Sequence, residues 1–99
     1  MPEKLDTDEI TEADAAVRNA QTVRSYHRKR SRRGNAQRET DIKLALDRLA
    51  EAMKPLRSQI GRFPYGPQTD KAEANRQVIY EASRRIQSER RKLWKMQKR

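Results

Sequence analysis

The middle and the last third of the chain each carry one stripe of mostly apolar residues at helical spacing. In both stripes the spacing alternates between four and three residues, which is typical of a helix that packs along one seam. Because such a stripe must be covered by a second helix, each segment predicts the other as its partner. The first stripe consists of Ile42, Leu46, Leu49, Met53, Leu56, Ile60 and Phe63, and the second of Ala72, Asn75, Ile79, Ala82, Ile86, Glu89, Leu93 and Met96.

The connection between the two stripes contains RFPYGPQTD, a segment rich in turn-forming residues. A connection this short favours an antiparallel pair of helices. One register then serves the whole length and places large residues opposite small ones, for example Met53 opposite Ala82. The weak position is Leu46 opposite Glu89, and we expect Glu89 to lie just off the seam.

We therefore predict an all-α fold: an antiparallel αα-hairpin with helices over about 36–61 and 70–97, plus an N-terminal helix over about 11–30. Pro55 lies inside the first hairpin helix and should kink it or break it in two. Thr11 is the expected N-cap of the N-terminal helix, with Asp14 three residues further on. The apolar stripe of that helix is weak and consists of Ile10, Ala13, Val17, Ala20 and Val23.

The composition limits how much core the chain can form. Its 99 residues suffice for one small domain, and only 33% of them are apolar whereas 38% are charged. With no cysteine and one histidine, neither disulfides nor a zinc site are expected to supplement a thin core, so association with a partner or a second copy becomes the expectation. We assign residues 1–10 to a flexible acidic tip and residues 11–99 to a single helical domain that includes the basic segment 24–38.

The charge of the chain is concentrated in two blocks. Residues 17–38 carry eight basic and no acidic residues, and residues 84–99 carry eight basic residues and one acidic residue. Blocks of this density favour a polyanionic partner, and the chain is predicted to be a small basic protein that contacts the phosphate backbone of DNA or RNA. The candidate nucleic-acid-binding residues are Arg24, Arg28, Lys29, Arg30, Arg32, Arg33, Arg84, Arg90, Arg91, Trp94, Lys95 and Lys98.

Both blocks also have a structural interpretation. The first is either an arm that follows phosphates or a solvated run of charge. In the second, Trp94 either stacks on a base or packs with Tyr80 under the N-terminal helix. The pattern does not separate DNA from RNA, and it contains no helix-turn-helix, RNA-recognition, zinc-finger or basic-zipper signature.

The alternative function is that of a helical protein-interaction module. A small accessory or modulator subunit, encoded by a phage or a mobile element, would dock on a larger protein through Tyr65, Tyr80 and Trp94. Phe63 continues the seam and is expected to close the open end of the hairpin. A homo-oligomer remains open as well.

Several classes of function are not expected. His27 is the single histidine and lies among cations, so no nucleophile has a suitable base beside it. The chain contains no glycine-rich phosphate loop and no HExxH motif. We therefore predict a protein that is not an enzyme, with no metal, no cofactor and no small-molecule substrate. No apolar stretch approaches the length of a membrane span, and the acidic start does not resemble a signal peptide, so a cytoplasmic location is expected.

Overall fold

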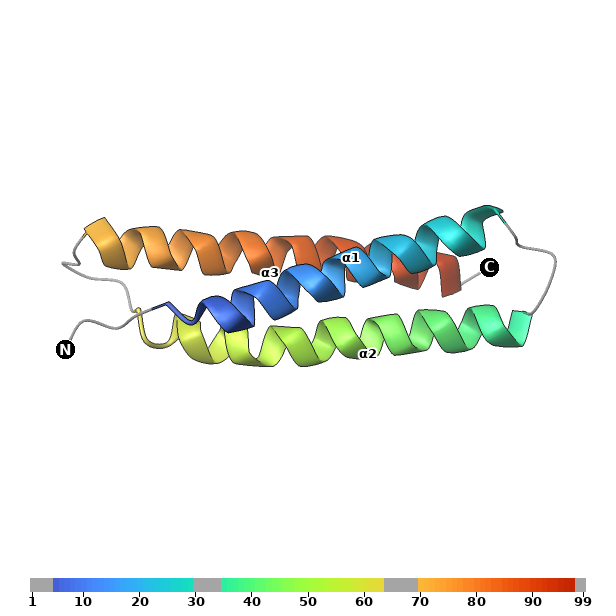
Figure 1. Cartoon of the computed structure of the whole chain (residues 1–99), viewed down its shortest axis with the longest axis horizontal. Coiled ribbons are helices and arrows are strands. Elements are labelled where there is room, and N and C mark those ends of the chain that lie inside the picture. The colour runs from blue at the N-terminus through green and yellow to red at the C-terminus, as the bar shows by residue number, and fades with distance from the viewer. Residues whose placement is uncertain (1–4, 30–34, 64–69, 98–99) are drawn as a thin grey trace.

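The computed structural model describes residues 5–29, 35–63 and 70–97 of the chain. It consists of three helices, α1 (Thr7–Lys29), α2 (Asn35–Ile60) and α3 (Asp70–Gln97). They form an elongated bundle in which α1 and α3 run in the same direction and α2 runs in the opposite one (Figure 1). The predicted all-α fold, a helical hairpin with an additional N-terminal helix, is confirmed.

The two predicted apolar stripes form the seam between α2 and α3. The large side chains in the middle of both stripes have no solvent exposure, and Met53 and Ala82 are buried with them. Complete burial of one such aliphatic side chain contributes about 1.5–3 kcal/mol, so this seam is the main source of stability. The fully buried large aliphatic residues are Ile42, Leu49 and Leu56 of α2 and Ile79, Ile86 and Leu93 of α3.

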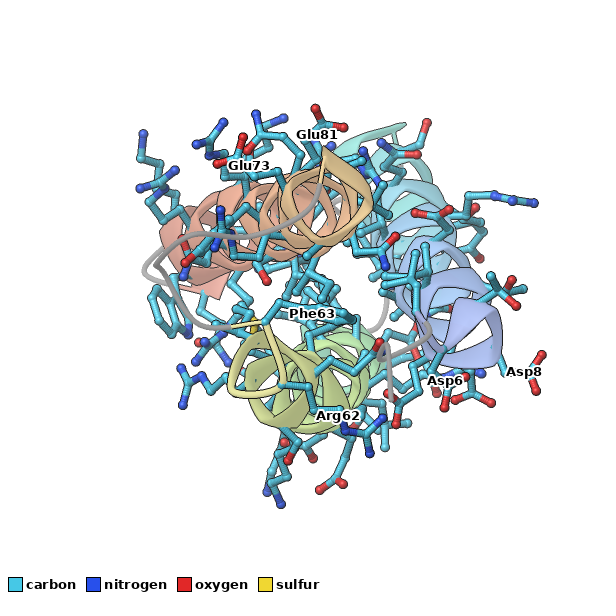
Figure 2. All side chains as sticks on the ribbon, turned by 90° about the vertical axis from the view of Figure 1, so that its left-hand side faces the viewer. Asp6, Asp8, Arg62, Phe63, Glu73 and Glu81 are labelled. Carbon is cyan, nitrogen blue, oxygen red and sulfur yellow. The ribbon has the colours of Figure 1, made fainter. Side chains whose placement is uncertain are left out.

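Phe63 closes one end of the hairpin, as expected from its place in the stripe. It follows the last turn of α2, where its backbone N–H donates to the carbonyl of Ile60 at 3.1 Å. Its side chain is 2% exposed and lies between the helices when the bundle is viewed from this end (Figure 2). The buried guanidinium of Arg76 donates to the Phe63 carbonyl at 3.4 Å, which ties the end of α2 to α3.

α1 covers the hairpin with small side chains. Ala13, Val17 and Ala20 are buried, and Ile10 and Val23 pack at the edge of the core. In Figure 1, α1 starts beside the C-terminal end of α2 and crosses toward the C-terminal half of α3. Because alanine buries little apolar surface, the attachment of α1 depends more on polar contacts than the attachment of the other two helices does.

The beginning of α1 differs from the sequence prediction. The helix starts at Thr7, and the predicted cap Thr11 is an interior residue whose hydroxyl donates to the carbonyl of Thr7 at 2.9 Å. Asp6 is the N-cap, and its Oδ1 accepts from the backbone N–H groups of Asp8 at 3.1 Å and Glu9 at 3.3 Å. Residues 7–10 of the predicted tip therefore belong to α1, whereas residues 1–4 lie outside the described residues.

A long-range contact explains why the helix starts at this point. The side chain of Gln59 on α2 is fully buried, and its Oε1 accepts from the Asp6 backbone N–H at 2.8 Å. Its amide nitrogen donates to the carboxylate of Glu9 at 2.6 Å. Both partners of Gln59 lie about fifty residues away, so local sequence rules favour the wrong cap.

We expect Asp6→Ala to lower the free energy of unfolding by about 1 kcal/mol, because the first turn of α1 loses its side-chain acceptor. Thr11→Ala should change the free energy of unfolding by less than about 0.5 kcal/mol, since the Thr11 hydroxyl only donates to a carbonyl of its own helix. Urea unfolding followed by circular dichroism measures both variants. A larger loss for Thr11→Ala than for Asp6→Ala would contradict the assigned cap.

Pro55 does not divide α2. The helix runs from Asn35 to Ile60 with Pro55 inside it, so the two-helix alternative does not form. Because proline has no N–H, the carbonyl of Glu51 lacks its usual donor four residues later. A kink at this position stays a prediction.

Candidate nucleic-acid interface

The fold brings the described parts of the two basic blocks, residues 24–29 with 35–38 and residues 84–97, toward one end of the bundle. α1 ends, α2 begins and α3 ends at this end, which lies on the right in Figure 1. The bundle extends over 55 Å, so its two ends are far apart. At this end, residues that are more than fifty positions apart in the sequence become neighbours. We call residues 24–29, 35–38 and 84–97 the cationic end. The opposite end includes Asp6, Asp8 and Glu73 (Figure 2).

Three cations of α3 form an exposed row. Arg84, Arg91 and Lys95 are spaced by seven and four residues, which places them on one face of the helix, and all three side chains are exposed. Within the described part of the chain, none of the three forms an ion pair with a carboxylate. Like charges at this spacing destabilise a helix slightly, and an anion bound along the row would relieve their repulsion.

Trp94 lies beside this row and is 43% exposed. The guanidinium carbon of Arg90 lies 4.8 Å from the centre of the Trp94 ring, which is a cation–π distance. Arg90 is half-buried, and its Nε is buried without a hydrogen-bond partner among the described residues. The ring is thus held by its own helix while part of it faces solvent, and it does not pack in the core.

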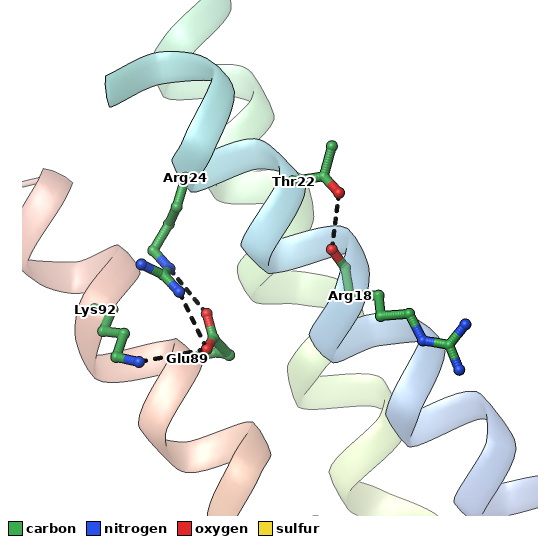
Figure 3. Close-up of polar contacts among 5 residues, drawn as sticks. All are labelled: Arg18, Thr22, Arg24, Glu89 and Lys92. Carbon is green, nitrogen blue, oxygen red and sulfur yellow. Dashed lines mark hydrogen bonds and ion pairs between the residues drawn. The ribbon is translucent and has the colours of Figure 1, made fainter. Parts of the chain in front are cut away.

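Arg24 has a different role from the other predicted site residues. Its Nε donates to Oε1 of Glu89 at 2.9 Å and its Nη2 donates to Oε2 at 3.2 Å. Glu89 is buried, and Lys92 also approaches its carboxylate at 3.6 Å (Figure 3). The Glu89 carboxylate is inside the bundle because a guanidinium from α1 neutralises it, and its expected place just off the α2–α3 seam stays a prediction. Arg18, one turn and a half earlier, points away from this cluster (Figure 3).

His27 is also an interior residue. Its side chain is 3% exposed, and its Nε2 lies 2.8 Å from Oδ2 of Asp41 on α2. Since a carboxylate can only accept, His27 donates through its Nε2–H. Its Nδ1 is buried without a partner among the described residues, and the ring of Tyr26 lies edge-on to it at 4.9 Å. This contact joins the last turns of α1 to the first turns of α2.

The contact with His27 makes Asp41 a contributor to acid stability. The hydrogen bond from His27, followed by the one from Gln37, lowers the pKa of the Asp41 carboxyl below its usual value of 3.8. A depressed folded-state pKa stabilises the fold above the unfolded-state value, and this stabilisation is lost as the pH falls through the folded-state value. We expect the stability of Asp41→Asn to fall less than that of the wild type between pH 5 and pH 2. Denaturation midpoints across this range measure it, and parallel curves would contradict the assignment.

Two further arginines connect different helices. Arg38 on α2 donates through Nη2 to the backbone carbonyl of Met96 at 2.9 Å, and this carbonyl belongs to the last turn of α3. Such carbonyls have no partner within their own helix, so Arg38 acts as a cap supplied by another helix. Arg85 forms an ion pair with Asp14 on α1 at 3.1 Å, and both side chains are exposed.

The remaining predicted residues are placed as follows. Arg28 and Lys29 lie in the last turn of α1, but their side chains are outside the described set. Tyr80 is half-buried on α3 and is engaged in a contact, and its expected packing under the N-terminal helix stays a prediction. Residues outside the described ranges are Arg30, Arg32, Arg33, Tyr65 and Lys98.

Within the described residues, no three of the histidine, aspartate and glutamate side chains come close enough together to hold a metal ion. None of the helices, searched over the same residues, is long and apolar enough to cross a membrane. Protein-family models, curated proteins and solved structures were compared with the chain, and none of them matches it.

Proposed function

We propose that this chain is a non-enzymatic nucleic-acid-binding protein that contacts the phosphate backbone through its cationic end. The observation that supports the proposal is the convergence of the ends of α1, α2 and α3, which brings the described parts of two basic blocks from distant parts of the sequence toward one end of the bundle (Figure 1). A single cationic surface on one end of an elongated molecule attracts a polyanion more strongly than two separate blocks would. The net charge of +10 gives the long-range attraction that steers such an encounter.

The contacting side chains are best supported on α3. Arg84, Arg91 and Lys95 are exposed and lie on one face over a rise of roughly 16 Å. Arginine and lysine side chains in such a row neutralise phosphates without reading bases, so affinity will depend steeply on salt and little on sequence. Arg24 is excluded from this surface because its guanidinium is used by Glu89.

Trp94 supplies an aromatic surface next to the row. An exposed aromatic ring flanked by cations suits stacking on an unpaired base, which contributes roughly 1–3 kcal/mol per base in single-strand-binding proteins. Trp94 therefore favours single-stranded nucleic acid, or a duplex with an unpaired base, over a regular duplex. As the single tryptophan of the chain, it also reports its own contact through its fluorescence.

Fluorescence-anisotropy titrations with labelled duplex DNA, single-stranded DNA and structured RNA test the proposal at two salt concentrations. We expect micromolar or tighter binding at low salt, a marked loss at higher salt, and quenching of Trp94 with the preferred ligand. An uncharged polymer of similar length serves as the control. If none of the three nucleic acids binds at low salt, the proposal is wrong and a protein partner must be sought.

A further inference from the structure

An open groove runs along the face that α1 and α2 share, between α1 residues 11–23 and α2 residues 41–55. Its volume is about 840 Å³. Its floor includes the buried alanines Ala16, Ala45 and Ala52, and Leu44 lies at its side with 57% of its surface exposed. Leu44 is thus a large apolar residue that the fold leaves uncovered beside an apolar floor.

The charge of this groove is opposite to that of the molecule. Its lining includes four carboxylates, those of Glu12, Asp41, Asp47 and Glu51, and one cation, Arg48. Asp41 is already bonded to His27, whereas Glu51 forms only an exposed ion pair with Lys54, which a ligand cation can replace. The chain as a whole has 24 basic and 14 acidic residues. An acidic border around an apolar floor is complementary to a helix that carries both apolar and basic side chains.

The groove also has the dimensions that a helix requires. The α1 residues that line it span roughly 18 Å at the rise of an α-helix, which corresponds to a ligand helix of about 12–14 residues. The small side chains of its floor allow the helix of a ligand to approach both α1 and α2 at normal interhelical distances of about 8–10 Å. Large apolar side chains of the ligand would then fill the space above the alanines.

Pro55 adds a specific feature at one end of the groove. The carbonyl of Glu51 has lost its intrahelical donor because residue 55 is a proline, and both residues line the groove. A lysine or arginine side chain of the ligand can donate to this carbonyl and to the Glu51 carboxylate together. This gives the proline inside α2 a binding role, in addition to its cost to the helix.

We infer that the α1–α2 groove is a docking site for a basic amphipathic helix of a partner protein. The partner contributes apolar side chains spaced by three and four residues, which contact Leu44 and the alanine floor. Its lysines or arginines lie against Asp47 and Glu51. This surface is separate from the exposed row of α3, so the protein can hold a basic helix and a nucleic acid through different faces.

Three labelled 16-residue peptides test the inference by fluorescence anisotropy on the full chain. The first has leucines at helical spacing with lysines elsewhere, the second has serines in place of the leucines, and the third has glutamates in place of the lysines. We expect the first to bind at least about tenfold more tightly than the second, because the apolar contacts carry most of the affinity. The third should bind independently of Leu44, through the cationic end alone.

Variants locate the site. Leu44→Ser should weaken the first peptide about fivefold, and Asp47→Lys/Glu51→Lys about tenfold at low salt. All of these positions are exposed, and circular dichroism verifies that the variants fold. Arg84→Gln/Arg91→Gln/Lys95→Gln is the control and should leave this affinity within about twofold, as expected for a distant surface. If Leu44→Ser leaves the affinity for the first peptide unchanged, or if the first peptide does not bind at all, the inference is overturned. A dimer of the free chain that Leu44→Ser abolishes in sedimentation equilibrium would also overturn it, because the occupant would then be a second copy.

Discussion

Replacing Arg24 with methionine should lower the free energy of unfolding by about 2–3 kcal/mol, a large fraction of the stability of a small domain. The reason is the carboxylate that remains. Glu89 is 5% exposed, and without the guanidinium of Arg24 it retains only Lys92, at 3.6 Å. A buried charge without a hydrogen-bonded partner is the costly result of such a substitution. We place the loss below the upper range for buried pairs because Arg24 itself is 19% exposed.

A double-mutant cycle separates the ion pair from the packing of the arginine stem. Arg24→Met/Glu89→Met should recover most of the lost stability, since two apolar side chains need no charge partner. Arg18→Met is the matched control because Arg18 lies exposed on the same helix, and we expect a change below about 0.5 kcal/mol. Urea unfolding measures the wild type, both single variants Arg24→Met and Glu89→Met, the double variant and Arg18→Met. Equal losses for Arg24→Met and Arg18→Met would mean that the Arg24–Glu89 contact does not hold α1 in place.

Arg84→Gln/Arg91→Gln/Lys95→Gln should weaken nucleic-acid binding about 100-fold near 0.1 M salt. Each neutralised phosphate contributes roughly 0.7–0.9 to the slope of log K against log salt, so the loss of three contacts should lower the slope by about 2–3. The fold should persist, because these side chains are exposed and have no carboxylate partner among the described residues. Anisotropy titrations at four salt concentrations give both the affinity and the slope.

Arg48→Gln/Arg57→Gln/Arg62→Gln controls for net charge. It removes the same number of exposed cations from α2 and from the turn after it, away from the cationic end. We expect its slope to stay within about one unit of the wild-type slope. If both triple variants lose affinity equally, the binding depends on total charge, and the row on α3 is not the contact surface.

The hairpin could be predicted from the sequence because its information is local and periodic. The stripes of α2 and α3 each keep one spacing over about six turns, and their central residues, such as Leu49 and Ile86, are buried. Phe63 extends the same stripe and closes the end of the hairpin for the same reason. In these segments the apolar pattern alone determines which side of each helix faces the core.

The parts of the structure that could not be predicted depend on polar side chains inside the bundle. Arg24 and His27 continue the four-and-three spacing of Ala20 and Val17, but in a dense basic segment Arg24 was interpreted as a nucleic-acid contact and His27 as one residue among cations. Their partners, Glu89 and Asp41, lie on other helices. Residue type alone does not reveal such a partner, whereas the spacing was a usable signal. The same applies to Gln59, whose contact with Asp6 sets the start of α1.

The most direct test of the central claim is an NMR titration of the ¹⁵N-labelled chain with the preferred nucleic acid. If the cationic end is the interface, the largest amide shifts will fall on residues 84–97 of α3, the last turns of α1 and the first turn of α2. The indole N–H of Trp94 and the side chains of Arg84 and Arg91 will shift with them. Shifts concentrated along the α1–α2 groove, or around Asp6 and Phe63 at the opposite end, would contradict the claim.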